Sequence, residues 1–195
     1  MKFIIALLAF FLTMPITHAS DSESFEFGDA VITHYSSDGS GSLQPKDVLK
    51  VGDSFEWHYR VSMDRMSDSV KAHILRSGYY QTEKNGRRLS SDLGLFFVMD
   101  GSTNSANVLC VMGHNFPGRS AMIRIDQNKS YTTLKNGCLP LSSKLLKELR
   151  QGLVVSVRGY KWPHDYTDDA DVDLDNFGTI FDFVNIQKKK LKQRR

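Results

Sequence analysis

The segment Phe55-Glu56-Trp57-His58-Tyr59-Arg60-Val61-Ser62 decides the fold class of this chain. Large apolar side chains alternate in it with polar ones, and a repeat of two residues is the pattern of a β-strand with one buried face. The aromatic face of this strand is therefore expected to point into a core, whereas the face with His58 and Arg60 is expected to meet water.

Further strands are predicted on both sides of this segment, because short apolar or alternating runs recur between clusters of turn residues. The Asn85-Gly86 pair is a strong signal for a tight hairpin turn, so strands should flank it. The run from Ser36 to Ser42 is rich in serine and glycine and is predicted to be a flexible loop. The other predicted strands lie at 25–27, 31–35, 70–80, 93–99, 107–112, 121–125, around 131 and at 153–160.

Helical spacing of apolar residues occurs in two places, both in the C-terminal half. The stretch from Ser142 to Gly152 places leucines on one face of a helix of about ten residues, with a serine at its start as the predicted N-cap and Gly152 as a predicted left-handed residue at the C-terminal end. The second helix follows Asp175, its predicted N-cap. The apolar face of that helix is formed by Phe177, Ile180, Phe181 and Val184.

Together these elements predict a single, mainly antiparallel β domain, either a sandwich or a partly open barrel, with two short helices in its C-terminal half. The length that remains after residues 1–19 is usual for one domain, which we place at 20–187, followed by a basic tail at 188–195. The net charge of +3 for the whole chain does not describe the domain. Lys2 and the tail supply the excess of positive charge, and the domain itself is mildly acidic.

Residues 1–19 have the composition of a secretory signal peptide. Lys2 precedes an apolar run from Phe3 to Met14, and Thr17-His18-Ala19 places small residues at the positions that determine cleavage. The apolar run is short for a bilayer span, and a polar segment follows it at once. We therefore expect an exported protein, periplasmic or secreted, that begins at Ser20; a retained membrane anchor is the alternative.

The chain has two cysteines, Cys110 and Cys138. Thiols tend to be oxidised in compartments reached by secretion, so we infer one disulfide between them. The alternative is a pair of buried free thiols.

The acidic stretch at 164–175 is the strongest candidate for chemistry in the sequence. Its spacing approaches that of a calcium-binding loop, but the turn glycine and the terminal bidentate glutamate of such a loop are missing. The candidate ligands are Asp171, Asp173 and Asp175, with Asp182 beyond them. A solvated strand explains the pattern more simply, since Val172 and Leu174 would point inward between aspartates that face water. The prediction is a structural strand without a metal ion.

A hydrolytic site is the alternative function for the same stretch. His164 lies among aspartates, and histidine with carboxylates can serve in general acid-base catalysis. The sequence contains neither a Gly-x-Ser-x-Gly elbow nor a zinc-protease helix motif. We therefore predict no catalytic residue and no cofactor.

The C-terminal tail could attract an anionic lipid surface or another polyanion. The lack of interleaved aromatic residues favours electrostatic attraction over base stacking. The alternative is a solvated, frayed terminus. The basic residues of the tail are Lys188, Lys189, Lys190, Lys192, Arg194 and Arg195.

The two tryptophans are a possible ligand platform. Trp57 and the Trp162-Pro163 pair are interpreted instead as core or loop packing.

The C-terminal half contains Ala121-Met122-Ile123-Arg124-Ile125-Asp126, Asn136-Gly137-Cys138, a helix from Leu145-Leu146 to Gly152 with a strand from Leu153, and Leu174-Asp175-Asn176-Phe177-Gly178. In these segments the chain resembles the invasion-associated locus B family of small secreted bacterial proteins. Family members generally carry a second cysteine shortly before the one that matches Cys138, where this chain has Tyr131–Lys135. The resemblance implies a β-rich envelope protein with a role in host association or surface integrity, and it implies no catalytic residues.

The leading hypothesis is thus a non-enzymatic periplasmic or secreted module that binds a protein or envelope-surface partner. The alternative is an envelope hydrolase with a site around His164. A deep pocket with converging histidine and carboxylates would favour the enzyme, and an exposed apolar patch or shallow groove would favour the binding module.

Overall fold

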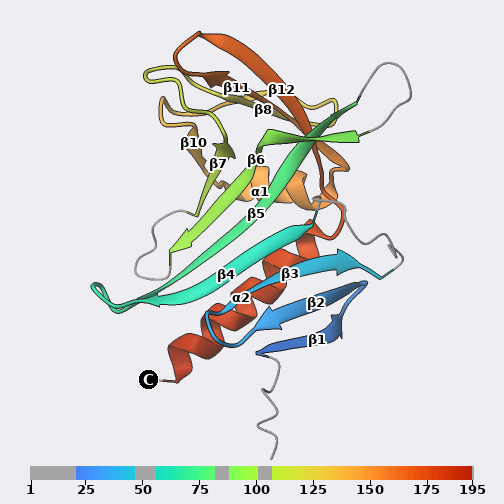
Figure 1. Ribbon diagram of the computed structural model, residues 1–195, viewed down its shortest axis with the longest axis vertical. Coiled ribbons are helices and arrows are strands. Elements are labelled where there is room, and N and C mark those ends of the chain that lie inside the picture. Colours follow the sequence, from blue (N-terminus) through green and yellow to red (C-terminus); the bar gives the residue numbers. More distant parts are fainter. Residues whose placement is uncertain (1–20, 47–55, 82–87, 101–106, 195) are drawn as a thin grey trace, which may run out of the picture.

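β-Strands make up 53% of the structure and form one large antiparallel sheet that does not close into a barrel (Figure 1). Two helices lie in the C-terminal half of the chain. The computed structural model describes residues 21–46, 56–81, 88–100 and 107–194. The predicted fold class, mainly antiparallel β with two helices in the C-terminal half, is confirmed.

The strands are β1 (Ser22–Phe27), β2 (Ala30–Tyr35), β3 (Ser40–Pro45), β4 (Trp57–Asp64), β5 (Ser69–Gln81), β6 (Arg88–Asp100), β7 (Val108–Met112), β8 (Met122–Ile125), β9 (Tyr131–Thr132), β10 (Cys138–Pro140), β11 (Val154–Lys161) and β12 (Tyr166–Asp173). The helices are α1 (Ser143–Gln151) and α2 (Phe177–Gln193). Strands β5 and β6 flank the predicted Asn85-Gly86 turn, but the turn itself, residues 1–19, Phe55 and Arg195 lie outside the described residues.

Strand β5 joins the N-terminal and C-terminal parts of the sheet. Neighbouring strands follow the order β1-β2-β3-β4-β5-β12-β11-β8-β9. The first half of β5 pairs with β4, and Tyr79 near its end pairs with Asp171 of β12. Along its other edge β5 pairs with β6, which is followed by β7 and β10.

A β-bulge lies where β5 leaves β4 and meets β12. The register between β5 and β6 shifts between Ser77 and Tyr79. A Cβ at Gly78 would lie only 2.8 Å from the carbonyl oxygen of Leu93, so a larger residue there would force the strands apart. The extra residues of this irregularity lie in β6, where three residues (91–93) stand opposite Gly78. At the same point β5 leaves β4 and meets β12.

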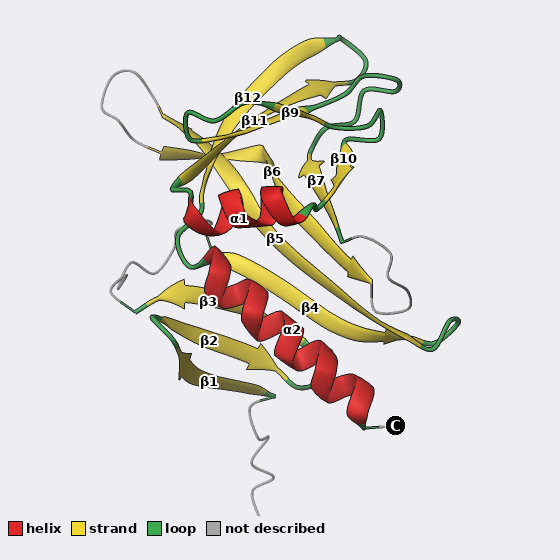
Figure 2. Ribbon diagram, turned by 180° about the vertical axis from the view of Figure 1, so that it is seen from behind, coloured by secondary structure: helices red, strands yellow, loops and turns green. Residues whose placement is uncertain are grey.

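Both helices cover the same face of the sheet, where the core forms (Figure 2). Trp57 of β4 lies against the start of α2, with its ring centroid 5.5 Å from that of Phe177 and 6.3 Å from that of Phe97. Its indole Nε1 donates a hydrogen bond of 2.8 Å to the carbonyl oxygen of Asp175. Tyr59 is buried on the same face, so the predicted alternation of this strand is confirmed.

The run from Ser36 to Ser42 is not the flexible loop that its composition predicted. It forms a tight turn, and β3 begins at Ser40. The carboxylate of Asp38 accepts hydrogen bonds from both the backbone nitrogen and the hydroxyl of Ser40, which fixes the turn. Gly39 has a φ of +70° and a Cβ there would lie 2.2 Å from the carbonyl oxygen of Val61, so the glycine permits a close strand approach.

The helix ends were predicted only in part. A serine caps the start of α1, as expected; it is Ser142, whose hydroxyl accepts a hydrogen bond from the backbone nitrogen of Leu145. Gly152 is extended rather than left-handed; a Cβ there would lie 2.5 Å from a side-chain carbon of Ile125. The N-cap of α2 is Asn176, in a left-handed conformation, and not Asp175.

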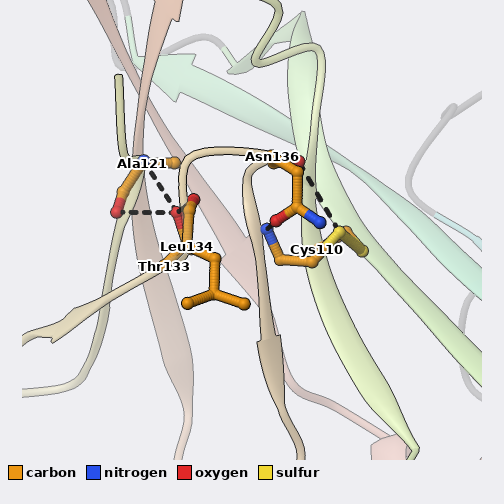
Figure 3. Close-up of a disulfide and its surroundings, with 6 residues drawn as sticks. Cys110, Ala121, Thr133, Leu134 and Asn136 are labelled. Carbon is orange, nitrogen blue, oxygen red and sulfur yellow. Dashed lines mark hydrogen bonds between the residues drawn. A yellow bond between two sulfur atoms is a disulfide. The ribbon is translucent and has the colours of Figure 1, made fainter. Parts of the chain in front are cut away.

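The two cysteines form the predicted disulfide (Figure 3). Cys110 of β7 and Cys138 of β10 are direct cross-strand partners, and their Cα atoms are 3.9 Å apart. The side-chain oxygen of Asn136 accepts a hydrogen bond of 3.1 Å from the backbone nitrogen of Cys138, which holds the turn that leads into β10.

Helix α2 is longer than the short helix that was predicted. It runs through Gln193, so the basic residues from Lys188 to Lys192 belong to the helix. Leu191 is partly buried and packs against the core. Within the described ranges, no helix combines the length and apolarity needed to cross a membrane.

Candidate binding surface

The acidic stretch forms β12 and the connection to α2, as its alternation predicted. Val172 and Leu174 are buried in the core. Asp171 points away from the core and accepts a hydrogen bond of 2.8 Å from the hydroxyl of Ser156 on β11. The carboxylates of this strand therefore contribute to the packing of the sheet.

The next two aspartates have cationic partners of their own. Asp173 accepts a hydrogen bond of 2.8 Å from the Tyr79 hydroxyl and pairs with Arg88. Burial, followed by the hydrogen bond to Asp173, raises the pKa of Tyr79 to about 12. Asp175 lies 2.6 Å from the Nη1 atom of Arg76, whose side chain is buried.

The candidate calcium ligands are thus separated from one another. Asp182 lies on α2 and pairs with Arg150 of α1. Among the described residues, no three histidine, cysteine or acidic side chains lie where they could hold one metal ion.

His164 does not form a catalytic arrangement with the aspartates beside it. It is exposed in the turn between β11 and β12. Its neighbour Asp165 pairs with Arg119, and Asp169 pairs with Arg158. No hydrogen bond joins the His164 ring to any other described residue.

Two loops at one end of the sheet bring aromatic side chains together that lie far apart in the sequence. The β7–β8 loop contributes Phe116 and Pro117, and the β11–β12 turn contributes Trp162 and Pro163; we call these four residues the aromatic loop cluster. The rings of Phe116 and Trp162 meet edge to face with centroids 5.3 Å apart. Trp162 nevertheless remains 59% exposed.

Hydrogen bonds fix the two loops against each other. The backbone nitrogens of Asn115 and Phe116 both donate to the carbonyl oxygen of Tyr160, at 3.1 and 3.2 Å. The side-chain oxygen of Asn115 accepts a hydrogen bond of 2.8 Å from the backbone nitrogen of Trp162. The exposed indole is therefore held in place by its backbone and by the ring of Phe116.

Arg119, which is exposed, makes further contacts with the cluster and its neighbours. Its guanidinium lies 5.8 Å from the centroid of Phe116 and 5.2 Å from that of Tyr160, within the range of cation–π attraction. The same guanidinium pairs with Asp165. Side chains from both loops are thus joined through one arginine.

Two shallow hollows lie on this part of the protein. One, of about 180 Å³, adjoins the cluster and is lined by His114, Asn115, Phe116, Pro117, Lys135 and Asn136. The other, of about 320 Å³, lies on the outer face of β8, β11 and β12. Its charged lining consists of Arg124, Arg158, Asp169 and Asp171, and histidine is absent from it.

Only one part of the cluster, Trp162-Pro163, has a signal in the sequence, and that signal predicts packing. The structure shows packing on Phe116 together with a largely exposed indole. Phe116, Arg119 and His114 gave no recognisable signal, because their roles depend on a contact with a turn that lies much later in the chain. Trp57, in contrast, is buried in the core as predicted.

Comparison with protein-family models, with curated proteins and with solved structures found no match to this chain. The resemblance to the invasion-associated locus B family therefore stays a prediction.

Proposed function

We propose that this protein is a non-enzymatic, exported envelope module that binds a protein or envelope-surface partner through the aromatic loop cluster. The main support is the exposure of Trp162 on loops that are already fixed. Tryptophan is among the residues that contribute most to protein interfaces, because it combines a large apolar area with few rotatable bonds.

The energetics favour binding at this position. Covering the exposed part of one tryptophan side chain removes apolar surface worth roughly 3 kcal/mol from water. The hydrogen bonds that join Asn115 and Phe116 to Tyr160 and Trp162 already order the loops, so little conformational entropy is lost when a partner docks. Loops on a rigid sheet are also where binding residues concentrate.

The cellular context rests on two observations. The Cys110–Cys138 disulfide is the kind of bond that persists in oxidising compartments. The composition of residues 1–19, which is typical of a signal peptide, supports export. The family resemblance supports a role in surface or host association.

The hydrolase alternative has less support. His164 is exposed, its neighbouring aspartates pair with arginines, and the hollow on β8, β11 and β12 has carboxylates but no histidine in its lining. The arrangement therefore lacks the hydrogen-bonded base that activates a nucleophile or water.

Site-specific photocrosslinking tests the binding proposal. A photoreactive phenylalanine analogue replaces Trp162 in cells that export the protein, and the matched control places it at Tyr35, another exposed aromatic position, 43% exposed on β2. We expect a discrete adduct from position 162 that is absent from position 35. Adding Phe116→Ala should weaken that adduct, since Phe116 supports the Trp162 ring.

Two crosslinking results would contradict the proposal, and an activity measurement tests the hydrolase alternative. Identical adducts from both positions, or no adduct from position 162, would contradict binding through the cluster. Turnover of simple ester or peptide substrates that disappears in His164→Ala would favour the hydrolase instead.

A further inference from the structure

The end of α2 presents basic side chains from an ordered helix. Helical structure continues through Gln193, well past Val184, the last fully buried residue of the helix. Leu191 packs against the core and so holds the final turns in place. We call Lys189, Lys190, Lys192 and Arg194, all exposed, the basic helix end.

The charges of the basic helix end are not neutralised by the rest of the described protein. Elsewhere arginine and lysine side chains commonly pair with carboxylates, as in Arg76–Asp175, Arg150–Asp182 and Arg158–Asp169. None of the four residues of the basic helix end forms an ion pair with another described residue. Uncompensated positive charge is therefore concentrated at one end of a domain that is otherwise mildly acidic.

An apolar side chain accompanies these charges. Ile186 is 38% exposed. Lys189 and Lys190 follow it by three and four residues, which places all three side chains on one face of the helix. Lysines around an exposed aliphatic residue are typical of a surface that meets lipid head groups.

We propose that the basic helix end and Ile186 dock this protein on the surface of an anionic lipid bilayer. This contact is independent of the partner binding proposed above, because it uses a different surface. Lipid fits better than nucleic acid, because the basic helix end has no aromatic side chain on which bases could stack, whereas Ile186 can enter the head-group layer.

Attachment through the basic helix end would also determine which way the aromatic loop cluster faces. The turn between β11 and β12 lies at the upper end of the longest axis, and the C-terminus of α2 lies toward the lower end (Figure 1). A protein attached through the basic helix end would direct the aromatic loop cluster away from the membrane, toward a partner on the other side.

Vesicle binding tests the proposal with the mature protein purified after export, which retains the whole of the C-terminal helix. The probes are vesicles of phosphatidylglycerol mixed with phosphatidylcholine, and vesicles of phosphatidylcholine alone; the bound fraction is measured by co-sedimentation. We expect binding to the anionic vesicles only, with a decrease as salt is raised. Lys189→Gln/Lys190→Gln should weaken the partition about tenfold or more.

Matched variants separate specific docking from general charge. Lys129→Gln/Lys147→Gln removes the same charge from exposed lysines elsewhere and should leave vesicle binding intact. Ile186→Ser should weaken binding several-fold without changing charge. Trp162→Ala should not affect vesicle binding, so this proposal and the partner proposal can fail separately.

Three outcomes would overturn the proposal. The first is equal loss from both lysine pairs, which would indicate attraction by net charge alone. The second is equal binding to neutral and anionic vesicles. The third is equally tight binding of a single-stranded oligonucleotide that does not depend on Ile186, which would assign the surface to nucleic acid.

Discussion

The backbone nitrogen of Tyr160 donates a hydrogen bond to Nδ1 of His114, and the two nitrogens are 3.0 Å apart. Because Nδ1 accepts, the proton of the neutral ring is on Nε2, which lies 3.2 Å from the carbonyl oxygen of Arg119. The imidazole of His114 therefore connects the β7–β8 loop to the end of β11 through Tyr160. Within the loop it also joins His114 to Arg119. The position of the aromatic loop cluster depends on this histidine.

His114→Ala should destabilise the protein and loosen the cluster. The substitution leaves a backbone donor and a carbonyl without their partner, at a net cost of about 1–2 kcal/mol. Urea unfolding measures the loss, and iodide quenching of Trp162 fluorescence measures the mobility, since Trp57 is buried from the quencher. His58→Ala, at an exposed position of β4, is the control and should change stability by less than about 0.5 kcal/mol. Equal effects of the two substitutions would show that the hydrogen bonds of His114 do not matter.

The ion pair between the buried Arg76 and Asp175 should contribute more to stability than a pair of the same chemistry in which both side chains are exposed. The Arg76 side chain is 6% exposed, so Asp175→Ala leaves a buried guanidinium without its carboxylate, at a cost of about 2 kcal/mol. In Arg158–Asp169 the side chains are 49% and 58% exposed, and Asp169→Ala should cost less than about 1 kcal/mol. Urea unfolding of both variants makes the comparison. A larger loss in Asp169→Ala would contradict it.

Local patterns in the sequence were sufficient for most strands and for the core. The alternation around Trp57 and the pattern of Val172 and Leu174 both correspond to buried positions in the structure. These buried positions can be predicted from the sequence because the alternation of side chains between the two faces of a strand is a local property. The disulfide was also predictable, since a chain with two cysteines offers only one intramolecular pairing.

Features that depend on distant contacts could not be predicted in this way. The serine- and glycine-rich composition around Gly39 predicts flexibility, because nothing local shows that the carbonyl oxygen of Val61 lies close to this glycine. Asp175 has the chemistry of an N-cap, yet its carboxylate pairs with Arg76 and Asn176 takes the cap position. The candidate site was missed for the same reason, since Phe116 and Trp162 meet only after β7, β8 and β11 have assembled.

His73 should make the protein less stable as the pH falls below neutral. Burial lowers the pKa of its imidazole, and the charges of Lys71 and Arg60 lower it further. In the unfolded chain the group titrates near 6.5, so below that pH the unfolded chain binds a proton that the folded protein resists. Stability is therefore retained above about pH 6.5 and lost as the pH falls toward the folded pKa.

Unfolding at a series of pH values checks this expectation. His73→Gln should flatten the decrease in the free energy of unfolding between about pH 7 and pH 5. Arg60→Gln should flatten it only in part, because the larger cause, burial, remains. A wild-type profile with the same slope as His73→Gln would contradict the prediction.

Two truncations should separate the structural part of the C-terminal helix from its basic part. Truncation after Gln187 removes Leu191, which packs against the core, and should cost about 1 kcal/mol because a partly buried leucine is lost. Truncation after Leu191 keeps that contact and should change stability by less than about 0.5 kcal/mol. The interpretation of residues 188–195 as a projecting tail predicts instead no loss in either variant. Urea unfolding distinguishes the two interpretations. The truncation after Leu191 should also weaken binding to anionic vesicles in part, because Lys192 and Arg194 are lost while Lys189 and Lys190 remain.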